Sequence, residues 1–141
     1  MTRKQPKRLP REGVDEYGRT PLHLAVIAHD LATVQRLLEE GANADAQDDN
    51  GWTPLHFAAQ DVLVEVVAAL LAAKADPSLT DSFGNSPLWR ATFSSQGDGR
   101  VIRLLRDAGA DPMQANNRGV SPVKLAKTIA NYDLAQFFSD I

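Results

Sequence analysis

The stretch Gly51-Trp52-Thr53-Pro54-Leu55-His56 decides the fold of this 141-residue chain, because the sequence repeats it. One copy, Gly18-Arg19-Thr20-Pro21-Leu22-His23, lies 33 residues earlier, and an altered copy, Gly84-Asn85-Ser86-Pro87-Leu88-Trp89, lies 33 residues later. A fourth copy, Gly119-Val120-Ser121-Pro122-Val123-Lys124, follows after another 35 residues. Residues 15–47 and 48–80 are identical at 11 of 33 positions. A period of this length indicates an array of stacked structural units.

Each copy has the chemistry of a helix start. The hydroxyl of its Thr or Ser can accept a hydrogen bond from an unpaired amide of the first turn, and the proline after it suits the first helical position. Further along each unit, apolar residues at helical spacing, such as Val67, Leu70 and Leu71, predict a second helix. One unit therefore consists of a turn, a helix, a loop and a second helix. In the third unit the loop between the helices, within residues 94–99, carries two extra residues.

The 33-residue period, the Thr-Pro-Leu-His signature and the helix exit at Gly41 resemble the ankyrin repeat family. The resemblance implies an all-α solenoid of four helix-loop-helix repeats with β-turn fingers, over residues 14–141. The repeats are expected at about 15–47, 48–80, 81–115 and 116–141. His29 and Val62 stand where the family usually has glycine, so we expect a non-standard loop between the helices there. Lys74 replaces an exit glycine, which costs about 1 kcal/mol if the left-handed backbone is kept.

The two ends of the chain differ from the repeats. Residues 1–13 carry five basic side chains and one acidic, and we expect them to form a flexible basic tail. Such a tail could neutralise phosphates, but it is short and lacks aromatic residues, and the rest of the chain is acidic. We therefore expect no nucleic-acid binding. At the other end, Phe137, Phe138 and Ile141 are expected to cover the last repeat.

The composition excludes several classes of protein. The chain has no cysteine, which removes disulfide frameworks, cysteine-ligated metal sites and cysteine nucleophiles. No segment approaches the roughly 20 apolar residues of a membrane span, and no apolar run follows the basic start as it would in a secretory signal. We expect a cytoplasmic protein that does not contact membranes and is a monomer when free.

No catalytic or metal-binding constellation stands out. His23 and His56 occupy equivalent positions of adjacent repeats, where the ankyrin resemblance implies a structural hydrogen-bonding role. His29 has no second ligand at metal spacing, and the carboxylates before Gly51 do not fit a calcium loop, because the spacing puts Ala46 at its first position. We therefore expect no enzyme activity, no cofactor and no metal.

The ankyrin resemblance implies that partners bind the concave face, formed by the fingers and the first helices. The residues that flank the fixed signature are the candidates for partner binding. They are Glu16, Tyr17, Arg19, Asp49, Asn50, Trp52, Gln60, Asp61, Ser82, Phe83, Asn85, Phe93 and Arg118. Four of them are aromatic, and aromatic residues are enriched at interface hot spots. The alternative is that these rings pack on one another and stiffen the fingers.

The function expected from the sequence is protein binding without catalysis. Acidic residues at Glu16, Asp48, Asp49 and Asp61 favour a partner with a basic surface. Residues 84–91 and 129–138 resemble small bacterial ankyrin proteins, which often act as immunity proteins. That resemblance implies occlusion of a cognate toxin, while a general adaptor for a cytoplasmic protein is the alternative. Arg100, Arg103 and Arg106 recur every three residues and are a candidate second contact, for an anionic partner.

Overall fold

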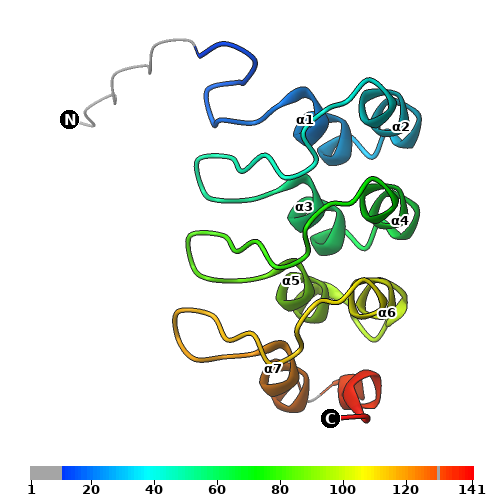
Figure 1. The fold of residues 1–141 in the computed structure, drawn as a ribbon. Coiled ribbons are helices and arrows are strands. Elements are labelled where there is room, and N and C mark those ends of the chain that lie inside the picture. Colours follow the sequence, from blue (N-terminus) through cyan, green and yellow to red (C-terminus); the bar gives the residue numbers. More distant parts are fainter. Residues whose placement is uncertain (1–10, 130) are drawn as a thin grey trace, which may run out of the picture.

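A computed structural model describes residues 11–129 and 131–141, and within them the chain forms seven α-helices and one 3-10 helix. The inner helices of the four repeats are α1 (Pro21–Ile27), α3 (Pro54–Gln60), α5 (Pro87–Ser94) and α7 (Pro122–Thr128). The outer helices are α2 (Leu31–Glu39), α4 (Val64–Ala72) and α6 (Arg100–Asp107), and η1 (Leu134–Phe138) follows α7. Figure 1 shows the repeats stacked in one direction, with the loops before the inner helices projecting to one side as fingers.

The inner helices begin where the repeated signature predicts. Thr20, Thr53, Ser86 and Ser121 are the N-caps, and each hydroxyl accepts a hydrogen bond from the amide three residues later. A proline follows each cap. The extended φ and ψ of each cap residue, close to −80° and 165°, turn the chain from the finger into the helix.

The fingers are held by a repeated backbone pattern. In each finger the first residue is Asp15, Asp48, Asp81 or Asn116, and its Oδ1 accepts hydrogen bonds from amides two and four residues ahead. Neighbouring fingers are also tied, because the amide of Ser82 donates to the carbonyl of Asn50 at 2.9 Å. A Cβ on Gly51 would come 3.0 Å from the Cα of Asp81, so the close approach of these two fingers requires glycine.

The core is a continuous apolar seam between the helix layers. Leu22, Leu55 and Leu88, at the same position of three inner helices, are fully buried. From the outer helices come Val34, Leu70 and Leu105, and Phe138 of η1 closes the seam after the last repeat. Phe137 is half-buried and Ile141 is exposed, so the expectation that Ile141 covers the last repeat is wrong.

The loops between the helices keep a left-handed residue although glycine is absent. The φ angles are 56° at His29, 55° at Val62 and 49° at Gln96, and the helix exit at Lys74 has φ 68°. The expectation of a non-standard loop at His29 and Val62 is therefore wrong, because the backbone keeps the geometry that a glycine would adopt. The two extra residues of the third repeat lie where the sequence places them. Five residues separate α5 from α6, whereas three separate α1 from α2 and α3 from α4. Over the described residues, no helix is long and apolar enough to cross a bilayer.

Candidate functional site

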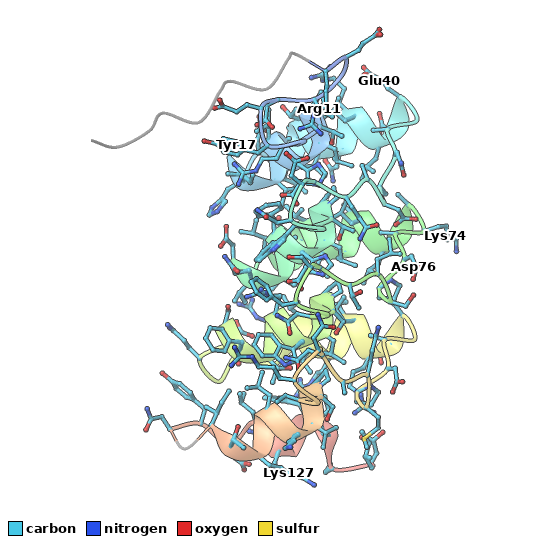
Figure 2. All side chains as sticks on the ribbon, turned by 90° about the vertical axis from the view of Figure 1, so that its left-hand side faces the viewer. Arg11, Tyr17, Glu40, Lys74, Asp76 and Lys127 are labelled. Carbon is cyan, nitrogen blue, oxygen red and sulfur yellow. The ribbon has the colours of Figure 1, made fainter. Side chains whose placement is uncertain are left out.

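One side of the stack brings most of the candidate residues together. We call it the finger face and define it as the fingers (residues 15–19, 48–52, 81–85 and 116–120) with the inner helices α1, α3, α5 and α7. Figure 2 looks onto the fingers and places Tyr17 on one edge of the stack, with Lys74 and Glu40 on the opposite edge. The exposed candidates on the finger face are Glu16, Tyr17, Asp49, Asn50, Ser82, Phe83, Phe93 and Arg118, and the exposed Asp61 directly follows α3.

Three of the four candidate aromatic side chains are exposed. The exposed fraction is 52% for Tyr17, 65% for Phe83 and 59% for Phe93. Phe83 is on the third finger, and Phe93 lies at the end of α5, where its ring stacks on Trp89 with centroids 5.4 Å apart. Exposed apolar rings gathered on one side of a small protein are typical of an interaction surface.

Trp52 is different, because it supports the face from beneath. It is half-buried, and its ring packs against Phe57 with centroids 4.7 Å apart. The guanidinium of Arg90, from the next repeat, lies over the same ring at 4.5 Å. The alternative that the rings stiffen the fingers therefore holds for Trp52. Gln60 is also half-buried.

Asn85, a candidate for partner binding, is buried. Its exposed fraction is 5%. Its amide donates to Oδ1 of Asp81 at 3.0 Å, and its own Oδ1 accepts from Nδ2 of Asn116 at 2.9 Å. Its backbone carbonyl faces Nε2 of His56 at 2.8 Å. Asn85 links the second, third and fourth repeats from within, and it also lines a groove between the third and fourth repeats.

The acidic candidates of the first two repeats are largely paired. Asp49 forms two hydrogen bonds with the guanidinium of Arg11, at 2.9 and 3.0 Å, and His29 lies 3.1 Å from Asp61. Asp48 is buried and lies 3.8 Å from Arg19, whose guanidinium also covers the ring of Tyr17. Arg11 belongs to the segment expected to be a flexible tail, and the remaining residues of that segment up to residue 10 lie outside the described residues. Only part of the acidic character expected of this region is therefore available to a partner.

Arg90 is a residue that the sequence analysis missed. Its Nη2 donates to Oδ2 of Asp81 at 2.9 Å, and its guanidinium contacts both Trp52 and Trp89. The cation lies between two rings and a buried carboxylate, and it fixes the middle of the finger face. A signal for it is the Trp-Arg pair at residues 89 and 90, where the other repeats have no arginine.

A groove of about 470 Å³ opens between the third and fourth repeats. Its apolar lining comes from Phe83, Trp89, Val120 and Leu125, and its polar lining consists of two cations and four amide or hydroxyl side chains. These are Asn85, Asn116, Asn117, Thr128, Arg118 and Lys124. Of the predicted residues, the groove brings together Phe83, Asn85 and Arg118.

His23 and His56 are structural, as the resemblance implies. In each, Nδ1 accepts a hydrogen bond from the amide of the N-cap threonine, and Nε2 faces a carbonyl of the next repeat at 2.8 Å. Nε2 therefore carries the proton. Burial lowers the pKa of both imidazoles, although the hydrogen bonds to the carbonyls of Trp52 and Asn85 oppose this. Within residues 11–129 and 131–141, no group of three or more His, Asp or Glu side chains could hold a metal ion.

The three arginines of α6, Arg100, Arg103 and Arg106, make contacts within the chain. Arg100 pairs with Asp98 at 2.7 Å and lowers the pKa of that carboxyl to about 2. Arg106 pairs with Asp140 at 2.6 Å and also donates to the carbonyl of Phe137. The guanidinium of Arg103 lies over the ring of Phe137 at 5.2 Å. Arg103 and Arg106 hold η1 against α6, which accounts for their spacing of three residues.

Comparison with known proteins agrees with this arrangement. A family model for ankyrin repeats, in three copies, matches residues 6–81 and also residues 22–116. No curated protein matches the chain. Ankyrin repeats generally mediate contacts between proteins and are typically not enzymes. The two matches span most of the sequence, the structure supplies stacked helical pairs with fingers, and the chain belongs to the ankyrin repeat family.

Proposed function

We propose that this chain is a non-catalytic module that binds another protein through its finger face. The observation that carries the proposal is the exposure of Tyr17, Phe83 and Phe93 on that face. An apolar ring that is more than half exposed contributes little hydrophobic free energy to folding. Most of its surface can therefore still be buried, with a gain in free energy, when a partner binds. Large rings also lose little conformational entropy on binding, which makes them effective anchors.

The scaffold beneath these rings is rigid, and this supports the proposal. Neighbouring fingers are joined by backbone hydrogen bonds, and Arg90 and Trp52 join the second and third repeats. A surface that is already ordered loses less entropy when a partner docks. The finger face is therefore prepared for binding with little rearrangement.

Charge supports a partner with a basic surface over the first two repeats. Residues 14–89 carry three basic and twelve acidic side chains. A pair between Arg11 and Asp49 reduces this charge, but the carboxylate of Glu16 is exposed on the first finger and forms no ion pair with a described residue. A net negative field attracts a basic partner and speeds its encounter.

More narrowly, we propose that the partner is a toxin domain and that the finger face occludes its active site in the cytoplasm. This rests on the resemblance of residues 84–91 and 129–138 to small bacterial ankyrin proteins of the immunity type. The alternative partner is an endogenous protein that the chain recruits as an adaptor.

The experiment is co-purification from native cells with two tagged baits, the natural chain and Phe83→Ala. The natural bait should retain a specific protein, and the variant should lose most of it while keeping the helical circular dichroism signal. A toxic enzyme as the prey supports immunity, and a structural or metabolic protein supports the adaptor. Equal recovery on both baits would contradict the finger face as the binding surface.

A further inference from the structure

The groove between the third and fourth repeats lies where a repeated contact is broken. At the two earlier junctions, Nε2 of a histidine faces a carbonyl of the next repeat at 2.8 Å. In the third repeat Trp89 takes the place of the histidine, and its buried Nε1 has no partner among the described residues. The ring of Trp89 stacks on Phe93 instead. At the two earlier junctions this bridge joins an inner helix to the next finger, and α5 and the fourth finger are left without it. Trp89 of α5 and Leu125 of α7 line the groove there.

The groove also differs from the rest of the finger face in charge. Arg118 and Lys124 line it and are exposed, and neither forms an ion pair with any residue in 11–129 or 131–141. By contrast, Arg11, Arg19 and Arg90 lie against carboxylates in the first three repeats. The unpaired cations of the finger face are therefore concentrated at its C-terminal end, around the apolar lining of the groove.

We infer that this groove receives a segment of the partner protein in which an aromatic or aliphatic side chain is flanked by acidic residues. The apolar side chain would fill the space between Phe83, Trp89 and Leu125. The acidic neighbours would pair with Arg118 and Lys124, which no carboxylate of the described chain neutralises. Both requirements come from the lining, and a cavity of about 470 Å³ is large enough for one large side chain and part of its neighbours.

The inference rests on the proposed function and gives the partner an orientation. The first two repeats are acidic and the groove is basic, so a bound protein would present its basic surface to the first two fingers and its acidic segment to the last two. An arrangement of this kind suppresses the reversed docking, because like charges would then face each other.

The test uses the fluorescence of Trp89 and needs no identified partner. The chain has two tryptophans, so Trp52→Phe leaves Trp89 as the single reporter in the groove wall. The probe is a blocked pentapeptide with phenylalanine at its centre and two acidic residues on each side. One control peptide replaces the phenylalanine with serine, and the other replaces the four acidic residues with lysine.

The acidic phenylalanine peptide should change the emission of Trp89 saturably. Both control peptides should bind at least about tenfold more weakly than this peptide. Lys124→Glu should weaken binding about tenfold, while Lys127→Glu, on the same helix α7 and outside the groove lining, should change it less than about twofold. Circular dichroism establishes that the variants are folded.

Equal binding of the lysine peptide, an equal loss with both lysine variants, or no saturable change would overturn the inference. A concentration-dependent change of emission without peptide, with dimers in sedimentation, would overturn it too, because the occupant would then be a second copy. A failed peptide titration alongside co-purification that still depends on Phe83 removes the groove inference alone. Co-purification that does not depend on Phe83 removes the proposed function.

Discussion

Lys74 has a left-handed backbone conformation that normally favours glycine. It follows the C-cap of the second repeat's outer helix with φ 68°, and the same place in the first and third repeats holds Gly41 with φ 87° and Gly109 with φ 93°. A side chain with a Cβ is strained in this region, by about 1 kcal/mol. Lys74 is exposed and forms no ion pair with a described residue, so no ion pair offsets the strain.

Lys74→Gly should therefore raise the free energy of unfolding by about 1 kcal/mol, measured from urea denaturation. Lys74→Ala is the matched control, because it removes the same side chain but keeps the Cβ. It should leave the stability nearly unchanged. Equal effects of the two variants would show that strain at this position is not what limits stability.

The two buried histidines make stability depend on pH. Burial lowers their pKa below the ordinary value of 6.5, so the native state resists a proton that the unfolded chain accepts. Their contribution is present above pH 6.5 and is lost as the pH falls below it. The pKa of Asp98 is about 2, and the carboxyls of Asp30, Asp76 and Asp140 also have a lowered pKa, so these four groups change stability only at lower pH.

The free energy of unfolding should fall between pH 7.5 and pH 5.5, with a slope of up to about 1.4 kcal/mol per pH unit for each histidine. His56→Asn should be less stable at pH 7.5 and should show a fall about half as steep. The measurement is a urea titration at a series of pH values. A stability that stays constant over this range in the natural chain would contradict the structural role of the two histidines.

At the scale of the element, the outer helix α4 lies in the middle of the stack and is buried from both sides. Leu70 is fully buried on it, while Leu24 of α1 is 43% exposed. Leu70→Ala should cost about 2–5 kcal/mol, because the neighbouring repeats cannot collapse fully onto the cavity. Leu24→Ala should cost less than about 1 kcal/mol. Equal denaturation midpoints for both variants would mean that the buried side of α4 is misplaced.

The elements could largely be predicted from the sequence, and the finger face only in part. Thr53 and Pro54 fix the start of α3 locally, so the repeated signature was sufficient to place the inner helices. Trp52 could not be placed in the same way, because it contacts Arg90, which lies 38 positions away in another repeat, as well as Phe57 of its own repeat. The burial of Asn85 could not be predicted for a similar reason, since two of its hydrogen-bond partners, His56 and Asn116, are in the neighbouring repeats. Position within a repeat predicts which side of the stack a residue is on, but not which contacts it finds there.

At the scale of the whole molecule, the two halves of the finger face differ in charge. Residues 90–141 carry seven basic and five acidic side chains, whereas residues 14–89 are strongly acidic. This difference acts at long range and affects the rate of association more than the rate of dissociation.

Glu16→Lys should slow association with the co-purified partner about two- to fivefold at low salt, because it reverses an exposed charge on the first finger. The effect should shrink as ionic strength rises, since salt screens exposed charges over about 10 Å at 0.1 M. Stopped-flow mixing at several salt concentrations measures it. An effect that does not depend on salt would mean that Glu16 acts through a direct contact, and the steering by the acidic half would be contradicted.

The central claim is that the finger face binds the partner, and photo-crosslinking from single positions tests it most directly. A photoreactive phenylalanine analogue is placed at position 83 on the third finger, or at position 40 or 74, on the edge of the stack opposite Tyr17 (Figure 2). The co-purified partner should be cross-linked from position 83 and not from positions 40 and 74. Cross-links from positions 40 and 74, with none from position 83, would contradict the account.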